Sequence, residues 1–239
     1  MNNSLLVISH YNLRPKDHLK KLIELTNDLP IDRLIVINDD SSKKNNLKRE
    51  SDSLSFLIRP NIGMNIGGWN DAFFCLPNYS YYIFIQDECL ILNKDFLMHY
   101  QELLSDRSVG MIGESLNPKW DTTWETLLNS SLNYSDKDHI INGVQIPRVC
   151  FYLELFKEWG ISPGIKATHL RSLIWAFKNE ILQRINGFPL GLNKGECIAS
   201  EIGVSKKIQE IGLEIKQVGI EPFSFIYHTE WNKNGYSKL

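Results

Sequence analysis

Short apolar runs alternate along the first half of the chain with segments whose apolar residues recur at helical spacing. The runs are rich in β-branched and aromatic residues, which favours strands, and they lie at 5–9, 33–38, 54–58, 81–86 and 109–113. The intervening segments predict helices over 16–28, 67–76 and 93–104, the last with Asn93 as its cap. Strands that are apolar on both faces and alternate with helices indicate an α/β fold, with a mostly parallel sheet and helices on both faces.

The pattern is weaker in the second half of the chain. Between 114 and 170, aromatic residues are scattered among polar ones, and we expect a loop-rich region there. The polar and basic segment 41–51 is typical of a solvated loop. From residue 173 on, the sequence predicts a short helix capped by Asn179 and ended by Gly187, a longer helix over 199–212, and strands over 213–219 and 223–228.

Four of the predicted strands are followed by polar clusters. The clusters are Ser9-His10-Tyr11-Asn12, Asn38-Asp39-Asp40-Ser41, Arg59-Pro60-Asn61 and Gln86-Asp87-Glu88. In a sheet of this kind, ligands bind in the crevice outside the carboxyl ends of the strands. Because burying an unpaired carboxylate is costly, we expect Asp87 and Glu88 to face this crevice rather than the core. The sequence therefore predicts a polar site at one edge of the sheet.

Composition limits the class of protein. The 239 residues can bury a substantial core, and 43% hydrophobic and 23% charged residues are ordinary for a globular domain. The net charge of −2 provides no basic field for nucleic acid. The N-terminus lacks the features of a signal peptide, and no apolar window is long enough for a membrane span, which leaves only peripheral contact with a membrane. We expect reduced thiols and a cytoplasmic protein, because no metal-ligand spacing joins Cys75, Cys89, Cys150 and Cys197.

Six motifs follow one another along the chain: VISHYN, INDDSS, RPNIGMNIGGWNDA, YIFIQDECLIL, IWAFKNEILQRINGF and SEIGVSKKIQEIGLEI. In this order they resemble the nucleotide-sugar domain of the family 2-like glycosyltransferases, which have a Rossmann-like GT-A fold. The resemblance covers 4–113 and 173–219 and is poor between 114 and 172. It implies a single GT-A domain over 1–239, in which 1–113 binds the nucleotide sugar and the loop-rich 114–239 binds the acceptor.

The resemblance also implies which residues bind the donor. They are Ser9, His10, Tyr11, Asn12, Asp39, Asp40, Asn61, Gly63, Gly67, Asn70, Gln86 and Asp87. Asp39 and Asp40 match the pair that contacts the nucleobase and ribose in the family, where carboxylates accept from N–H and hydroxyl groups. An Asx turn after the strand would use the same aspartates. The glycines would allow close approach of the backbone to the donor.

The segment Gln86-Asp87-Glu88 resembles the family's DXD motif, which holds a divalent cation. Mn²⁺ or Mg²⁺ would offset the charge that grows on the departing diphosphate, and it needs only one or two protein carboxylates. The resemblance implies Glu88 and Asp87 as metal ligands, with the late His228 beside them. Gln86 departs from the family's first carboxylate, which puts metal dependence in question. An exposed acidic turn without any metal would explain the same residues.

Inverting transfer needs a base for the acceptor hydroxyl. Glu201 matches the family's base, and Glu196 is a second candidate, whereas Ser200 replaces the acid that normally precedes the base. A glutamate in the first turn of a helix is also favoured by the helix dipole alone. Further candidates are Arg171 and Lys233 for the diphosphate, and Trp120, Trp124 and Trp231 for stacking on sugar rings, although most such aromatic residues are core residues.

Together these implications define the expected function. It is inverting, metal-assisted transfer of a sugar from a nucleoside-diphosphate donor, with UDP favoured, to a glycan or lipid-linked acceptor. The setting would be bacterial surface-polysaccharide synthesis, in the cytoplasm or at the inner face of the membrane. A nucleotidyltransferase would pair a similar sheet with metal-binding acids, but ISHYNLRPK lacks a glycine-rich basic loop. A catalytically decayed nucleotide- or sugar-binding domain would explain Gln86 and Ser200.

Overall fold

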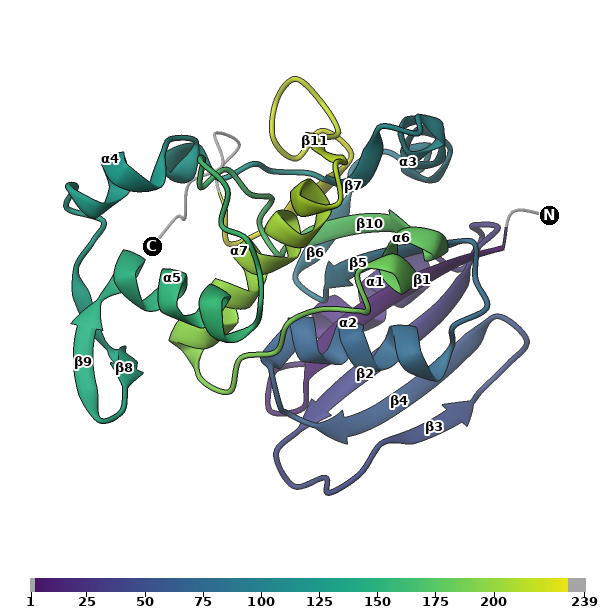
Figure 1. Cartoon of the computed structure of the whole chain (residues 1–239). Helices are drawn as coiled ribbons and strands as arrows, with labels where there is room; N and C mark the ends of the chain where they lie inside the picture. Colours follow the sequence, from purple (N-terminus) through teal and green to yellow (C-terminus); the bar gives the residue numbers. More distant parts are fainter. Residues whose placement is uncertain (1–2, 232–239) are drawn as a thin grey trace.

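Eight strands form the central sheet of the computed structural model, which describes residues 3–231 (Figure 1). Their order across the sheet is β11–β7–β10–β5–β1–β2–β4–β3. Parallel pairing joins β1 (Ser4–Tyr11), β2 (Asp32–Asp39), β4 (Leu54–Pro60) and β5 (Tyr81–Gln86), and also β7 (Val109–Gly113) and β11 (Glu214–Gln217). Antiparallel strands are β10 (Ile174–Lys178), between β5 and β7, and β3 (Asn46–Arg49), at the edge. The predicted α/β fold with a mostly parallel sheet is confirmed.

Both faces of the sheet are buried, as the continuous apolar runs of its strands predict. In β1, Leu5 and Val7 belong to one core cluster, whereas Leu6 and Ile8 belong to another. Fully burying one such side chain stabilises the fold by about 2 kcal/mol. The first cluster includes residues of α2 (Met64–Cys75), α6 (Asn179–Arg184) and α7 (Lys194–Glu210), and the second includes residues of α1 (Asp17–Leu25) and α3 (Phe96–Ser105). Helices therefore cover each face.

The register of the sheet brings the polar strand ends to one edge. Ser9 lies opposite Gln86, and Tyr11 lies opposite Asn38. Asn38 in turn lies opposite Arg59 of β4. The clusters that the sequence places after four different strands thus share one edge of the sheet, because those strands run parallel and their ends are level. Asp87 and Glu88 are buried at this edge, however, rather than open to a crevice as expected.

The region from 114 to 170 is less loop-rich than predicted. It contains a 3₁₀ turn, η1 (Pro118–Trp120), the helices α4 (Trp124–Leu128) and α5 (Arg148–Glu158), and an antiparallel pair, β8 (Ser135–Ile141) and β9 (Val144–Pro147). These elements share a third core cluster with residues of α7. Trp120 and Trp124 are buried in this cluster. Most of the scattered aromatic residues are therefore core residues, whereas Tyr134 is exposed. They meet only in the folded chain, so no regular spacing in the sequence predicts them.

Several boundaries differ from the expected ones. The segment 41–51 contains the edge strand β3, whose residues are all exposed and so show no apolar alternation. Helix α3 begins at Phe96 after Asp95, while Asn93 accepts the N–H of Asp95 in the preceding turn. Helix α7 begins at Lys194 rather than 199.

Two further elements are shorter than the sequence predicts. The strand expected over 223–228 is only β12 (Ile226–His228), which pairs with β6 (Cys89–Ile91) in a separate two-stranded sheet. The short helix expected after 178 is α6, which ends at Arg184. Its first residue, Asn179, donates to the carbonyls of Pro77 and Tyr79 instead of capping the helix. All four cysteines carry free thiols, and no helix within 3–231 is long and apolar enough to cross a membrane.

Candidate active site

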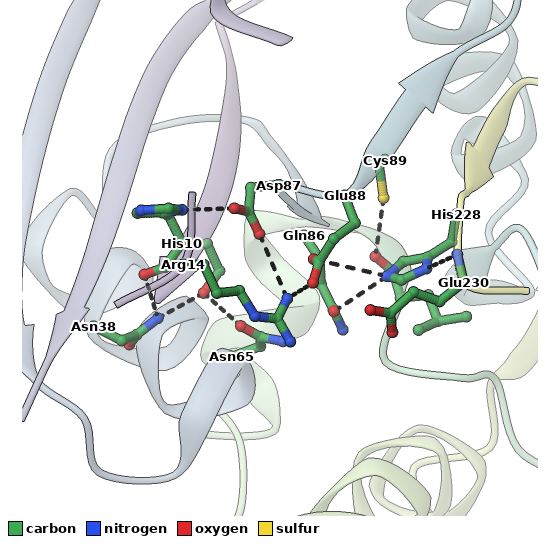
Figure 2. A network of polar contacts seen from close by, with 12 residues as sticks. His10, Arg14, Asn38, Asn65, Gln86, Asp87, Glu88, Cys89, His228 and Glu230 are labelled. Atoms are coloured by element: carbon green, nitrogen blue, oxygen red, sulfur yellow. Dashed lines mark hydrogen bonds and ion pairs between the residues drawn. The ribbon is translucent and has the colours of Figure 1, made fainter. Parts of the chain in front are cut away.

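The small β6–β12 sheet determines which residues meet beside the end of β5. Its antiparallel pairing places His228 opposite Cys89, immediately after the Gln86-Asp87-Glu88 turn. His228 Nε2 consequently lies 3.2 Å from Gln86 Oε1, although the two residues are 142 positions apart in the sequence. Figure 2 shows His228 on one side of this turn and His10 of β1 on the other.

Asp87 is paired with His10 inside the protein. Its Oδ2 lies 2.6 Å from His10 Nδ1, and both side chains are buried. The main-chain N–H of Asp87 also donates to the carbonyl of Ser9, 3.0 Å away. His10 Nε2 is buried and has no hydrogen-bond partner within the described chain. The predicted donor ligands His10 and Asp87 are therefore adjacent, but their side chains are paired with each other.

Glu88 faces a cation that the sequence pattern did not single out. The guanidinium of Arg14 contacts Glu88 Oε1, and its Nη1 lies 4.0 Å from Asp87 Oδ1 (Figure 2). The other oxygen, Glu88 Oε2, is buried without a hydrogen-bond partner in residues 3–231 and lies 4.0 Å from His228 Nε2. Arg14 is partly exposed, whereas the two carboxylates are largely covered. Nothing in the sequence near Arg14 connects it to a residue so far along the chain.

His228 is a neutral hydrogen-bond donor in this arrangement. Burial, together with a smaller effect of the charge of Arg14, lowers the pKa of His228 to about 4. The N–H of Glu230 donates to Nδ1 of the ring at 3.3 Å. Because Nδ1 accepts, the proton of the neutral ring sits on Nε2, which donates to Gln86 Oε1. Gln86 Nε2 in turn donates to the carbonyl of Ser172 at 2.7 Å.

This buried histidine predicts a loss of stability in mild acid. Its pKa is about 4 in the folded protein against 6.5 as the ordinary value, so the unfolded chain binds more protons between these values. Stability should be fully present above pH 6.5 and fall as the pH drops toward 4, by on the order of 3 kcal/mol. Urea unfolding at pH 7 and pH 5 measures this. His228→Gln should reduce the difference in the free energy of unfolding between pH 7 and pH 5. Replacement of the exposed His18 should leave this difference as it is. An unchanged difference in His228→Gln would contradict the role of His228 in the loss of stability.

A second network joins the ends of β1, β2 and β4 to helix α2. Asn38 Nδ2 donates to Ser9 Oγ at 2.8 Å, and Ser9 Oγ donates to Asn65 Oδ1 at 2.8 Å. Arg59 donates to Asn38 Oδ1 at 2.6 Å and to Asp71 Oδ2 at 2.6 Å. Ser9, a predicted donor ligand, is fully buried within this network. Asn65 is a residue that motif reasoning missed, because its partners lie on other elements.

The Asp39-Asp40 pair lies at the exposed end of β2. Asp39 Oδ1 accepts from the N–H and the hydroxyl of Ser41 at 2.9 and 2.8 Å, which is the Asx turn considered for this sequence. These hydrogen bonds, together with the Asn12 side chain, hold the pKa of Asp39 below its usual value despite a small opposing effect of burial. The hydroxyl of Tyr11 donates to Asp40 Oδ2 at 2.6 Å. The predicted residues Tyr11, Asn12, Asp39 and Asp40 therefore form one exposed acidic group.

The glycine-containing turn before α2 comes close to its own helix. Asn61 lies in this turn, and Gly63 has the left-handed φ of 74°. A Cβ on Gly67 would lie 1.9 Å from the carbonyl oxygen of Ile62. Asn70 Oδ1 accepts the N–H of Phe188 at 2.8 Å, which connects α2 to the segment before α7. This structural contact explains the asparagine even if no nucleotide sugar binds to it.

Glu201 of α7 is held by three hydrogen-bonding groups. Its Oε2 accepts from the N–H and hydroxyl of Ser172 at 2.7 and 2.6 Å, and its Oε1 lies 3.3 Å from His169 Nε2. Burial raises the pKa of Glu201, but the contacts with His169 and Ser172 outweigh it and leave the pKa below its usual value. Glu201 is therefore ionised near neutral pH. Through Ser172 it is connected to Gln86.

The remaining candidates are placed differently. Glu196 accepts from Leu192 N and Asn193 Nδ2 at the start of α7, which is the role of a helix-capping residue. The guanidinium of Arg171 lies 4.3 Å from the ring centre of Trp231 and donates to Ser115 Oγ. Lys233 lies outside the described residues.

The expected metal ligands do not fit a metal ion as arranged. No three His, Cys, Asp or Glu side chains within 3–231 are grouped so that they could hold one. Asp87 is engaged by His10, Glu88 by Arg14, and His228 presents an N–H rather than a lone pair. The predicted metal ligands are therefore already engaged by other groups of the protein.

Comparisons with solved structures show which known fold this architecture resembles. No family model matches the chain, and no curated protein matches it. Among solved structures, the mannosyltransferase PcManGT from Pyrobaculum calidifontis, in complex with GDP-Man and Mn²⁺, is similar with a TM-score of 0.52 and 16% identity over 89% of this chain. The chain has a GT-A-like fold. It spans 53% of that mannosyltransferase chain, and at this identity the likeness concerns the fold rather than the substrate.

A second structure is a putative glucose-1-phosphate thymidylyltransferase from Bacillus anthracis in complex with a sucrose. It aligns with a TM-score of 0.44 and 9% identity, over 89% of this chain and 86% of the other. The likeness to the mannosyltransferase and the sheet itself confirm the fold expected from the six motifs, with the polar strand ends at one edge of the sheet. Several polar side chains at that edge bind one another, a feature that the motifs do not predict.

Proposed function

We propose that the chain is a glycosyltransferase that moves a sugar from a nucleoside-diphosphate donor to an acceptor hydroxyl. The observation that carries the proposal is the gathering of polar residues from the ends of β1, β2 and β5 at one edge of a GT-A-like sheet. A similar fold holds GDP-Man in the mannosyltransferase. In this proposal the exposed Asp39-Asp40 group binds the base and ribose, and the segment from Gln86 to Glu88 lies beside the diphosphate.

The donor is a nucleoside diphosphate with UDP as the first candidate, and GDP is the second because of the mannosyltransferase. The main-chain turn at Gly63 would lie close to the donor, since it has no side chain to hold the donor away. Mn²⁺ and Mg²⁺ are left out of the proposed chemistry, because the expected ligands already have partners of their own.

Glu201 is the proposed general base. It is ionised, it lies on α7, and its link through Ser172 to Gln86 connects it to the proposed diphosphate side of the crevice. Glu201 would take the proton of the acceptor hydroxyl as the acceptor oxygen attacks the sugar carbon. The bond from that carbon to the diphosphate breaks on the opposite face and the nucleoside diphosphate departs, so this single displacement inverts the configuration. His169 and Ser172 hold the carboxylate in one orientation.

The acceptor is proposed to be a glycan or a lipid-linked glycan that binds against the region from 114 to 172. The third core cluster gives this region a rigid frame next to α7. The proposed setting is bacterial surface-polysaccharide synthesis at the inner face of the membrane, with peripheral contact only.

The proposal is tested with a variant pair that the chain itself offers. Asp39 and Asp106 make the same Asx turn, each accepting from the N–H and hydroxyl of a serine two residues later at 2.9 and 2.8 Å. Replacing either aspartate by alanine should lower the free energy of unfolding by about 1 kcal/mol, because the turn loses its side-chain hydrogen bonds. Only Asp39→Ala should weaken nucleotide binding, by about tenfold, because it alone lies at the crevice edge.

The measurement is a thermal-shift titration with UDP, GDP and other nucleoside diphosphates, with and without Mn²⁺. A ligand that binds only the folded state raises the melting temperature. A selective shift that Asp39→Ala loses and Asp106→Ala keeps supports the donor site. If no nucleotide shifts the wild-type protein, the nucleotide-sugar proposal fails. Binding without hydrolysis or transfer would favour the decayed binding domain instead.

A further inference from the structure

We propose that Arg14 is the resident cation of the Gln86-Asp87-Glu88 turn. It keeps divalent metal ions off Glu88 and presents its guanidinium to the diphosphate of a bound nucleotide. The first part stands on the contacts of Arg14 alone, and the second part rests on the proposed function. Arg14 belongs to none of the six motifs, and its role follows only from the folded arrangement.

The position of Arg14 is set by the end of β1. Its main-chain N–H donates to the carbonyl of Tyr11 at 2.9 Å, so the chain turns immediately after the strand. This turn directs the side chain across the end of β5, where the guanidinium contacts Glu88 Oε1 and lies 4.0 Å from Asp87 Oδ1. Figure 2 shows the guanidinium between these two carboxylates and the side of the network formed by Asn38 and Asn65.

The exposure of the three groups shows which of them a ligand would meet. The side chain of Arg14 is 45% exposed, whereas those of Asp87 and Glu88 are 4% and 12% exposed. Arg14 is therefore the most accessible of the three charged side chains, and both carboxylates are largely covered. A molecule entering from solvent meets a positive charge here, not the acidic groups that the sequence suggests.

Both carboxylates of the turn already have partners without a metal. Gln86 has no charge where the resembled motif has an acid, Asp87 is paired with His10, and Glu88 is paired with Arg14. His228 offers an N–H to this side of the site. A divalent ion at Glu88 would have to displace Arg14 and then remain beside the same positive charge, which is unfavourable in a largely buried site.

The guanidinium is suited to a diphosphate. Arginine carries five N–H donors in a planar fork that matches phosphate oxygens, and it stays charged at all relevant pH values. The contact with Glu88 engages Nη1, which leaves other donors directed away from that carboxylate. Such a cation would offset negative charge on the departing diphosphate by hydrogen bonds, which is the electrostatic contribution that a metal would otherwise supply.

The first test measures Mn²⁺ binding without nucleotide, by the loss of the free-ion signal in electron paramagnetic resonance. The wild-type protein should bind Mn²⁺ weakly, and Arg14→Gln should bind it about tenfold more tightly because Glu88 is released. The double variant Arg14→Gln, Glu88→Gln should lose this gain. Arg49→Gln removes the same charge from an exposed arginine of β3 and should behave as wild type. Tight Mn²⁺ binding by the wild type, or no gain in Arg14→Gln, overturns the metal-exclusion role.

The second test measures the binding of UDP and GDP by calorimetry, in EDTA and in Mn²⁺. The wild type should bind its nucleotide in EDTA, and Arg14→Gln should lose about tenfold in affinity there, with Arg14→Lys in between. If the wild type binds a nucleotide only with Mn²⁺, the diphosphate role of Arg14 is overturned while the proposed function stands. If no nucleotide binds to any variant, the proposed function fails together with that role, and the Mn²⁺ titration alone decides metal exclusion.

Discussion

Replacing Glu114 by alanine should destabilise the fold by roughly 3 kcal/mol or more. Glu114 follows β7 directly, and its carboxylate is fully buried. It accepts the hydroxyl of Tyr100 at 2.5 Å and the N–H groups of Phe225 and Ile226 at 3.2 and 3.1 Å. Removing the carboxylate leaves these donors buried without a partner, and each unsatisfied group costs about 1–3 kcal/mol.

Urea unfolding followed by tryptophan fluorescence measures this effect. Glu102→Ala is the matched control, because Glu102 lies on the same helix as Tyr100 with an exposed side chain. It should change the free energy of unfolding by no more than about 0.5 kcal/mol. A double-mutant cycle of Glu114→Ala with Tyr100→Phe should show a coupling energy, since the two groups share one hydrogen bond. Equal stability of the two alanine variants would show that water satisfies the donors.

Gly67→Ala should destabilise the fold by roughly 2 kcal/mol even though alanine favours helices. The added Cβ would lie 1.9 Å from the carbonyl oxygen of Ile62, a main-chain atom that cannot rotate away. The turn at Gly63 must therefore shift, and overpacking of this kind outweighs the helix-propensity gain of about 1 kcal/mol.

Gly203→Ala provides the contrast. Gly203 also lies inside a long helix, but an added Cβ there would meet only side-chain atoms, the nearest 3.2 Å away on Pro189. We expect Gly203→Ala to be neutral or slightly stabilising in the same urea measurement. If Gly67→Ala is as stable as Gly203→Ala, the loop before α2 is free to move, and its close approach to α2 is not a constraint on the site.

The sequence was sufficient for most of the sheet, because strands such as β1 and β5 carry their own signal. It did not predict β10 (Ile174–Lys178), whose residues precede the expected short helix. β1 and β5 are apolar on both faces, so their burial between helices could be inferred without any contact information. The polar ends of these strands could be placed at one edge, since parallel strands end on the same side. The edge strand β3 could not be predicted, because all of its residues are exposed and its pairing depends on β4.

The sequence identified polar residues that lie near one another in the candidate site, but it did not predict their contacts. His228 does lie beside Glu88, but the N–H of Glu230 sets its ring as a donor, and no motif contains that information. Arg14 could not be found at all, since its partners lie on a turn far along the chain. The roles of Glu201 as the base and of Asp39 as a donor ligand remain predictions, and the thermal-shift titration with Asp39→Ala tests the second.

The position of β10 has a consequence for how the polypeptide is made. β10 inserts between β5 and β7 and runs opposite to both, although the chain builds those two strands first. During synthesis the facing edges of β5 and β7 stay open until residue 178 has emerged, and open strand edges favour pairing with other chains. The nascent protein should therefore depend on chaperones until β10 has emerged and closed the sheet between β5 and β7.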